Sequence, residues 1–153
     1  MFNPYGPVKG KGVLAEVAQY CKFPIVWCYN DMTRYRHFGT DYKTPPIDNV
    51  IQLRNISQSE LYYLYEKAAA YICFSINEGF GWAVADAFVY DLPIISRNTG
   101  IVTFLGDQKG VMRYRTKEEL IGHLAEGCLE KPDYNKSILD KYTYRGLVDR
   151  LFC

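Results

Sequence analysis

The segment Ser75-Ile-Asn-Glu-Gly-Phe-Gly-Trp-Ala-Val-Ala-Asp86 joins an apolar run to an apolar helix candidate through two glycines. The run before it, residues 70–75, has the length of a buried strand, and residues 82–90 favour a helix. Gly79 and Gly81 lack a Cβ atom, so a ligand can approach their backbone closely. The pattern therefore predicts a strand, a ligand-accessible loop and a helix in succession.

Two carboxylates bracket this loop, Glu78 within it and Asp86 in the following helix. Carboxylate oxygens accept hydrogen bonds from hydroxyl groups. The first amides of the helix present free N–H groups and a partial positive charge, which favour an anion. The loop therefore suits a polyhydroxylated ligand that carries phosphate.

The rest of the chain alternates between strand and helix patterns without an internal repeat. The expected strands are residues 23–29, 49–54, 92–96 and 110–114, and the expected helices are residues 13–20, 57–68, 116–128 and 133–153. Ser57 with Glu60 and Thr116 with Glu119 each form a capping-box pattern. Residues 30–48 read as a long loop, and such loops are more often functional or mobile than inert. Alternation of this kind predicts a single Rossmann-like α/β/α domain over residues 1–153, with three layers around a parallel sheet.

Ligands of such folds sit beyond the carboxyl ends of the strands. Four segments are expected at that edge. They are the Glu78 loop, Lys9-Gly-Lys-Gly12, Arg54-Asn55 and Asn98-Thr-Gly100. Their convergence supports a site without naming its ligand.

Composition excludes several classes of protein. The chain has 153 residues, of which 48% are hydrophobic and 23% charged, so we expect an ordered globular domain. A net charge of +1 with dispersed Lys and Arg gives no nucleic-acid footprint. We expect no transmembrane segment and no signal peptide. Five cysteines without a C-x-x-C pair, beside two histidines, indicate free thiols in a cytoplasmic protein and no zinc site.

Several motifs together resemble the C-terminal, nucleotide-sugar-binding domain of retaining GT-B glycosyltransferases. Glu78-Gly-Phe-Gly81 followed by Asp86 resembles the E-x7-E motif of that family, with Asp in place of the usual second Glu. The other resembling segments are Lys11-Gly-Val13, Ser57-x-x-Glu60-Leu61, Leu92-Pro-Ile-Ile95 and Asn98-Thr-Gly-Ile101. Asp91 stands where glycine is commoner, and the arginine expected near residues 4–7 is absent.

The resemblance implies a role for each matching residue. Glu78 and Lys11 would be catalytic, with Glu78 facing the donor sugar hydroxyls and Lys11 offsetting diphosphate charge as the leaving group departs. Gly79, Phe80 and Gly81 would present backbone amides to the donor, and Asp86 would hold the ribose hydroxyls. The remaining implied donor-binding residues are Lys9, Arg54, Asn55, Asn98, Thr99 and Gly100. Neither metal nor other cofactor is implied, and the nucleoside-diphosphate sugar is the substrate.

The implied function is a metal-independent retaining glycosyltransferase. Family enzymes react in a cleft between two domains, so we expect a homo-oligomer or a separate acceptor-domain chain to complete the cleft. One alternative is a non-catalytic nucleotide-sugar-binding or interaction module. Another is an NAD-type domain, because Gly10-x-Gly12-x-x-Ala15 with Asp31 fits the dinucleotide fingerprint. Trp82 and Phe88 are both expected in the core.

Overall fold

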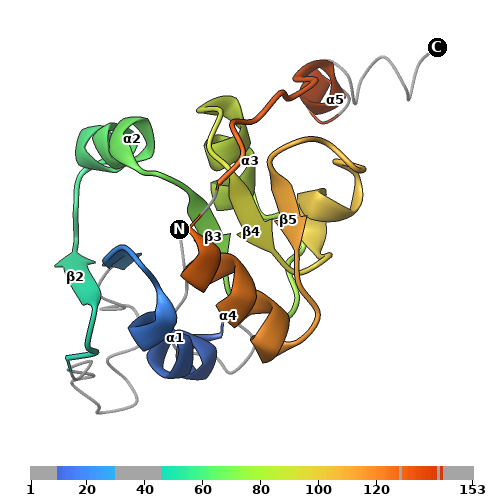
Figure 1. Cartoon of the computed structure of the whole chain (residues 1–153). Coiled ribbons are helices and arrows are strands. Elements are labelled where there is room, and N and C mark those ends of the chain that lie inside the picture. Colours follow the sequence, from blue (N-terminus) through green and yellow to red (C-terminus); the bar gives the residue numbers. More distant parts are fainter. Residues whose placement is uncertain (1–9, 30–45, 128, 141, 143–153) are drawn as a thin grey trace.

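The structure is a computed structural model that describes residues 10–29, 46–127, 129–140 and 142 (Figure 1). The helices are α1 (Lys11–Val17), α2 (Gln58–Lys67), α3 (Trp82–Val89), α4 (Lys117–Glu126) and α5 (Ser137–Asp140), with 3-10 helices η2 (Ala18–Tyr20) and η4 (Gly100–Thr103). The strands are β1 (Ile25–Tyr29), β2 (Val50–Arg54), β3 (Tyr71–Cys73), β4 (Ile94–Ser96) and β5 (Val111–Arg113). Strands and helices alternate, which confirms the predicted α/β class.

Among the described residues the strands pair in two parallel groups, in agreement with the parallel pairing predicted from the sequence. In one sheet β1 pairs with β2, with Ile25 opposite Val50. In the other, β4 lies between β3 and β5, with Ile94 opposite Tyr71 and Val111. All three described ladders are parallel, as βαβ connections predict.

Two apolar clusters cover opposite faces of the three-stranded sheet, because successive strand residues point to opposite sides. Ile94 belongs to the cluster beneath α3, which also contains Phe88 from that helix. Ile95, the next residue, belongs to the cluster that contains Leu14 of α1 and Leu120 of α4. Figure 1 shows α1 beside α4, away from α3, so the domain has helix, sheet and helix layers.

Both predicted capping boxes are present. The Ser57 hydroxyl accepts a hydrogen bond from the Glu60 amide, and the Glu60 carboxylate accepts one from the Ser57 amide at 2.7 Å. Thr116 and Glu119 make the same reciprocal pair at the start of α4. These bonds satisfy helix N–H groups that lack partners within the helix, and so fix where α2 and α4 begin.

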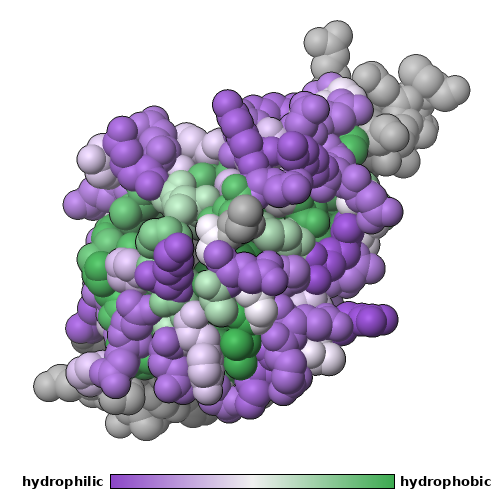
Figure 2. All heavy atoms as spheres, in the orientation of Figure 1, coloured by the Kyte–Doolittle hydropathy of each residue, from purple (hydrophilic) through white to green (hydrophobic). Residues whose placement is uncertain are grey.

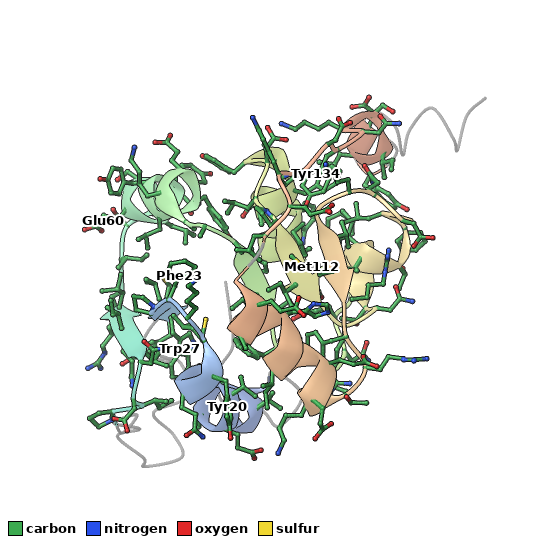
Figure 3. The ribbon with its side chains drawn as sticks, viewed as in Figure 1. Tyr20, Phe23, Trp27, Glu60, Met112 and Tyr134 are labelled. Carbon is green, nitrogen blue, oxygen red and sulfur yellow. The ribbon has the colours of Figure 1, made fainter. Side chains whose placement is uncertain are left out.

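Three tyrosine hydroxyls tie distant segments of the chain together. Tyr65 donates to the Ala83 carbonyl at 3.2 Å, and Tyr114 donates to the Cys73 carbonyl at 2.9 Å. The hydroxyl of Tyr134 lies 2.8 Å from the Leu92 carbonyl and 2.9 Å from that of Gly110. Tyr134, labelled in Figure 3, also stacks on Phe88 with ring centroids 4.3 Å apart, so it joins its segment to α3.

Two expectations about the elements were wrong. The last helix was expected from Asp133, whereas α5 begins at Ser137 and residues 133–135 are not helical. Trp82 was expected in the core, but 69% of its surface is exposed. The long loop at residues 30–48 lies outside the described residues up to 45, as does the chain after 142.

Candidate functional site

The loop predicted to bind a ligand joins β3 to α3. Phe74 and Ser75 are buried after the end of β3, and the chain then emerges through exposed Asn77 and Gly79, with the half-buried Glu78 between them. Gly81 caps α3 with φ 85° and ψ 58°, a left-handed conformation that favours glycine. A Cβ atom on Gly79 would have no atom within 4 Å, so the space over its backbone is open. The loop is anchored at both ends and accessible in its middle.

A second loop packs directly against the first. The Glu78 amide donates a hydrogen bond to the Thr99 hydroxyl at 2.8 Å, and the Ile101 amide donates to the Phe80 carbonyl at 2.6 Å. Gly100 allows this approach, because a Cβ there would lie 2.5 Å from the Phe80 carbonyl oxygen. The structure therefore brings together residues 78–81 and 98–101, two of the four segments predicted to converge.

The two acids of the E-x7-E-like motif lie around a common tyrosine. Glu78 and Asp86 are both partly buried, one in the loop and the other in the middle of α3. Burial raises the pKa of Tyr71 well above its usual range, and the charges of Cys73, Tyr65, Glu78 and Asp86 raise it further. Burial also raises the pKa of Asp86. Both carboxylates therefore lie near enough to Tyr71 to disfavour its ionisation.

The first helix begins beside the same strand. Lys11 is the first residue of α1, and Gly10 precedes it with φ 76°. A Cβ on Gly10 would lie 2.2 Å from the Phe74 carbonyl oxygen, so the helix start packs on the chain that leads into the Glu78 loop. This places the backbone of Lys11 at the predicted edge. Lys9 lies outside the described residues.

Arg54 and Asn55 lie on the other sheet. Arg54 ends β2, and Asn55 follows it in a left-handed conformation with φ 53°. The Asn55 amide donates to the Tyr29 carbonyl at 2.9 Å, which aligns the carboxyl ends of β1 and β2. Both side chains are exposed at the carboxyl end of their strand, as predicted.

Sequence reasoning missed one cation at this edge. Arg97 follows β4 and immediately precedes Asn98, so its signal was a basic residue at the carboxyl end of a parallel strand. Its guanidinium carbon lies 5.1 Å from the Tyr114 ring centroid, and Nη1 donates to the Arg115 carbonyl at 2.8 Å. Arg97 therefore adds positive charge next to the Asn98 loop. Its hydrogen bond to the Arg115 carbonyl connects it to the segment that precedes α4.

Within the residues that the structure describes, no group of three or more His, Cys, Asp or Glu side chains could hold a metal ion. Among the same residues, no helix is long and apolar enough to cross a membrane.

A parallel α/β domain with a glycine-containing loop between two acids at its carboxyl edge is the arrangement of a nucleotide-binding Rossmann-like domain. The profile of the family "Glycosyl transferases group 1" matches residues 40–137, from before β2 to the start of α5. The chain belongs to this family, as the C-terminal nucleotide-sugar-binding domain of the retaining GT-B glycosyltransferases. The match includes Glu78, Asp86 and the loop at residues 98–101. A search of curated proteins finds no match.

Proposed function

We propose that this domain binds a nucleoside-diphosphate sugar at the Glu78 loop and transfers its sugar with retained anomeric configuration and without a metal ion. The single observation that carries the proposal is the joined pair of loops. Glu78 is held by Thr99 at its backbone while the space above Gly79 stays open. Family membership supplies the donor class, because group 1 domains act on nucleotide sugars.

Each acid has a distinct proposed role. The Glu78 carboxylate accepts hydrogen bonds from the sugar hydroxyls, and Asp86 accepts them from the ribose. Glu78 lies in the loop and Asp86 in the middle of α3, so the two acids would contact different parts of the donor. The backbone amides of Gly79, Phe80 and Gly81 face the sugar and phosphate oxygens, and Asn98, Thr99 and Gly100 border them.

The lysines have the electrostatic role. Lys11, with Lys9 in place of the missing arginine, offsets negative charge as the diphosphate leaves, which stabilises the transition state more than the ground state. Arg54 and Asn55 border the nucleotide base.

Donor binding can be measured by titration calorimetry with a panel that contains UDP-glucose, GDP-mannose and NAD. We expect one sugar nucleotide to bind and NAD to give no heat of binding. Glu78→Gln should weaken binding of the sugar nucleotide by about 10- to 100-fold, the usual loss for a hydrogen bond to a charged group. Glu126→Gln is the matched control, because Glu126 is exposed at the far end of α4. Failure of every sugar nucleotide to bind would overturn the donor assignment, and binding of NAD alone would favour the dinucleotide alternative.

Turnover separates the transferase from the non-catalytic module. The transferase predicts transfer or slow hydrolysis of the bound donor, with the product anomer matching the donor in an NMR time course, and with the rate unchanged by EDTA. Loss of activity in EDTA would contradict the metal-independent mechanism. Tight donor binding without any turnover, even with added acceptors, would favour the binding module.

We further propose that a second chain, of this kind or another, completes the cleft beside the Glu78 loop. Aromatic side chains gather next to that loop, with the rings of Phe80 and Trp82 4.5 Å apart and Tyr142 5.5 Å from both Phe80 and Phe104. Trp82 is 69% exposed and Phe104 59% exposed. Exposed apolar surface of this kind commonly marks an interaction site.

A further inference from the structure

Arg97 is a cation that the fold keeps half-buried and without a carboxylate partner. Figure 2 shows hydrophilic residues over much of the outer surface, and exposed arginines there have carboxylates nearby. Arg113 forms an ion pair with Asp107 at 3.2 Å, and Arg115 lies 3.8 Å from Glu119. No ion pair within the described part of the chain includes Arg97. Taking a charge out of water without a counter-ion is costly, so this position favours an anion that the chain itself does not supply.

The side chain of Arg97 is fixed at the carboxyl ends of three neighbouring strands. The residue follows β4, and its Nη1 donates at 2.8 Å to the carbonyl of Arg115, beyond the end of β5. Its guanidinium carbon lies 5.1 Å from the ring centroid of Tyr114, whose hydroxyl donates to the Cys73 carbonyl at the end of β3. Ligands of parallel α/β sheets bind beyond this edge. The guanidinium is therefore held at the edge where the proposed donor lies.

The guanidinium of Arg97 has hydrogen-bonding capacity that the described residues do not use. Its Nε is buried and has no hydrogen-bond partner among them. Buried donors are almost always paired, so an unpaired donor at a ligand-binding edge indicates a group from outside the chain. A guanidinium presents five N–H donors in a rigid planar fork that matches the oxygens of a phosphate. The side chain as a whole is only half-buried, so part of this fork is accessible.

The backbone of Arg97 is connected to the loop proposed to bind the sugar. The Thr99 amide donates to the Arg97 carbonyl at 2.9 Å, and the Thr99 hydroxyl accepts a hydrogen bond from the Glu78 amide at 2.8 Å. The start of α1 lies against the same strand end, because Gly10 packs on the Phe74 carbonyl. Arg97 therefore shares one edge with the loop proposed for the sugar and with the helix start proposed for the diphosphate.

We propose that Arg97 binds the diphosphate of the donor, with its guanidinium donating hydrogen bonds to the phosphate oxygens. This inference rests on the proposed function, because the sugar nucleotide supplies the diphosphate. The diphosphate carries more than one negative charge, so Arg97 adds to the positive charge proposed for Lys11. When the bond to the sugar breaks, negative charge grows on the departing diphosphate. A guanidinium already fixed by Tyr114 and the Arg115 carbonyl stabilises that charge without reorganising.

Heteronuclear NMR of the unmodified full chain tests the contact without relying on a variant that must fold. The Arg97 Nε–H signal, identified by its absence from the spectrum of Arg97→Lys, should move on titration with inorganic pyrophosphate, UDP or GDP. Uridine and guanosine lack phosphate and should leave it in place. If both nucleoside diphosphates move the backbone signals of the Glu78 loop but not this signal, the assignment of Arg97 is overturned and donor binding stands.

Affinity measurements separate binding of phosphate from support of the fold. Arg97→Met should weaken binding of the preferred nucleoside diphosphate by about 10- to 100-fold, while the affinity for its nucleoside stays unchanged. Arg97→Lys should restore part of the loss, because it returns the charge but not the planar fork. Arg115→Met is the matched control, since it removes an arginine whose side chain is 90% exposed, and it should change the affinity by about threefold or less. Equal losses for the nucleoside and its diphosphate in Arg97→Met would overturn the proposal.

Pyrophosphate distinguishes this inference from the proposed function. Binding of pyrophosphate that moves the Arg97 signal, without binding of any sugar nucleotide, would overturn the donor assignment but retain Arg97 as a phosphate-binding residue. Binding of neither pyrophosphate nor a nucleoside diphosphate to the wild-type chain would overturn both.

Discussion

At the scale of single residues, the site depends on backbone positions that exclude most side chains. Gly100 has φ 55° and lies against the Phe80 carbonyl, whereas Gly106 has a similar φ of 63° but no atom within 4 Å of a built Cβ. Asp91 occupies a further left-handed position with φ 54°, which explains why glycine is commoner at the matching position of the family. Lys136 supports Asp91 there through a 2.8 Å ion pair.

The two glycines form a matched pair for mutation. Gly106→Ala should cost about 1 kcal/mol from its positive φ alone, while Gly100→Ala should cost about 2–4 kcal/mol because the Phe80 carbonyl must also move. Chemical denaturation measures both values. We also expect Gly100→Ala to weaken donor binding, because the displaced loop carries Glu78. Equal stability losses would show that the close approach of the two loops is not needed.

Residue identity alone brought several candidate residues to two adjoining loops, but it did not predict how exposed their neighbours are. Glu78, Thr99 and Gly100 were named from motif and strand order, and the structure joins them by hydrogen bonds and close packing. The exposure of Trp82 was not predictable, because an apolar residue at the start of an apolar helix is usually buried. Whether Trp82 is buried depends on which surface of the domain packs against another segment, and the local sequence does not determine that.

At the scale of elements, local hydrogen bonding decided where helices begin. The starts of α2 and α4 were predicted correctly because each capping box is complete within four residues. The start of α5 was misplaced because residues 133–135 gain stability from long-range contacts instead. The Asn135 backbone amide donates a hydrogen bond to Oε1 of Gln108 at 2.7 Å. The Tyr134 hydroxyl donates to the carbonyl of Leu92, which is also distant in the sequence. Such contacts join residues far apart in the sequence and leave no periodic pattern.

The capping box of α4 gives a pH-dependent prediction. Hydrogen bonds from the Arg115 and Thr116 amides lower the pKa of Glu119 below its ordinary value of 4.5. A lowered folded-state pKa means that this stabilisation is complete above pH 4.5 and is lost as pH falls through the folded-state value. We therefore expect Glu119→Gln to reduce the acid sensitivity of Tm below pH 4.5. Thr116→Ala should cost about 1 kcal/mol at neutral pH. If Tm falls as steeply below pH 4.5 in the Glu119→Gln variant as in the wild type, Glu119 makes no such contribution.

At the scale of the whole molecule, the parallel α/β class was predictable, but which of the described strands pair with one another was not. Alternating patterns specify strands and helices, and parallel pairing follows from the crossovers between them. Which strands pair depends on backbone hydrogen bonds between residues such as Ile25 and Val50, which are far apart in the sequence.

The exposed aromatic surface gives a prediction about assembly. If a second copy completes the cleft at Trp82 and Phe104, the double substitution to Ser should abolish concentration-dependent association in sedimentation experiments. Tyr63→Ser is the control, because Tyr63 is equally exposed at 60% but lies on α2 and not in the aromatic group of Phe80, Trp82 and Phe104. A wild-type chain that stays monomeric at high concentration yet transfers donor sugar would contradict a completing partner altogether.

The buried tyrosines set the alkaline limit of the domain. Burial raises the pKa of Tyr65, Tyr71 and Tyr134 well above 10 and that of Tyr114 to about 12. In the unfolded chain these phenols ionise near pH 10, so each contributes stability that is complete below that pH and is lost as pH rises toward the folded-state value. Ultraviolet titration of phenolate should therefore proceed in two stages, with the exposed tyrosines ionising first and the buried ones only as the fold opens. Tyr134, whose hydroxyl lies against two carbonyls, belongs to the second stage and so reports when the C-terminal segment leaves the sheet.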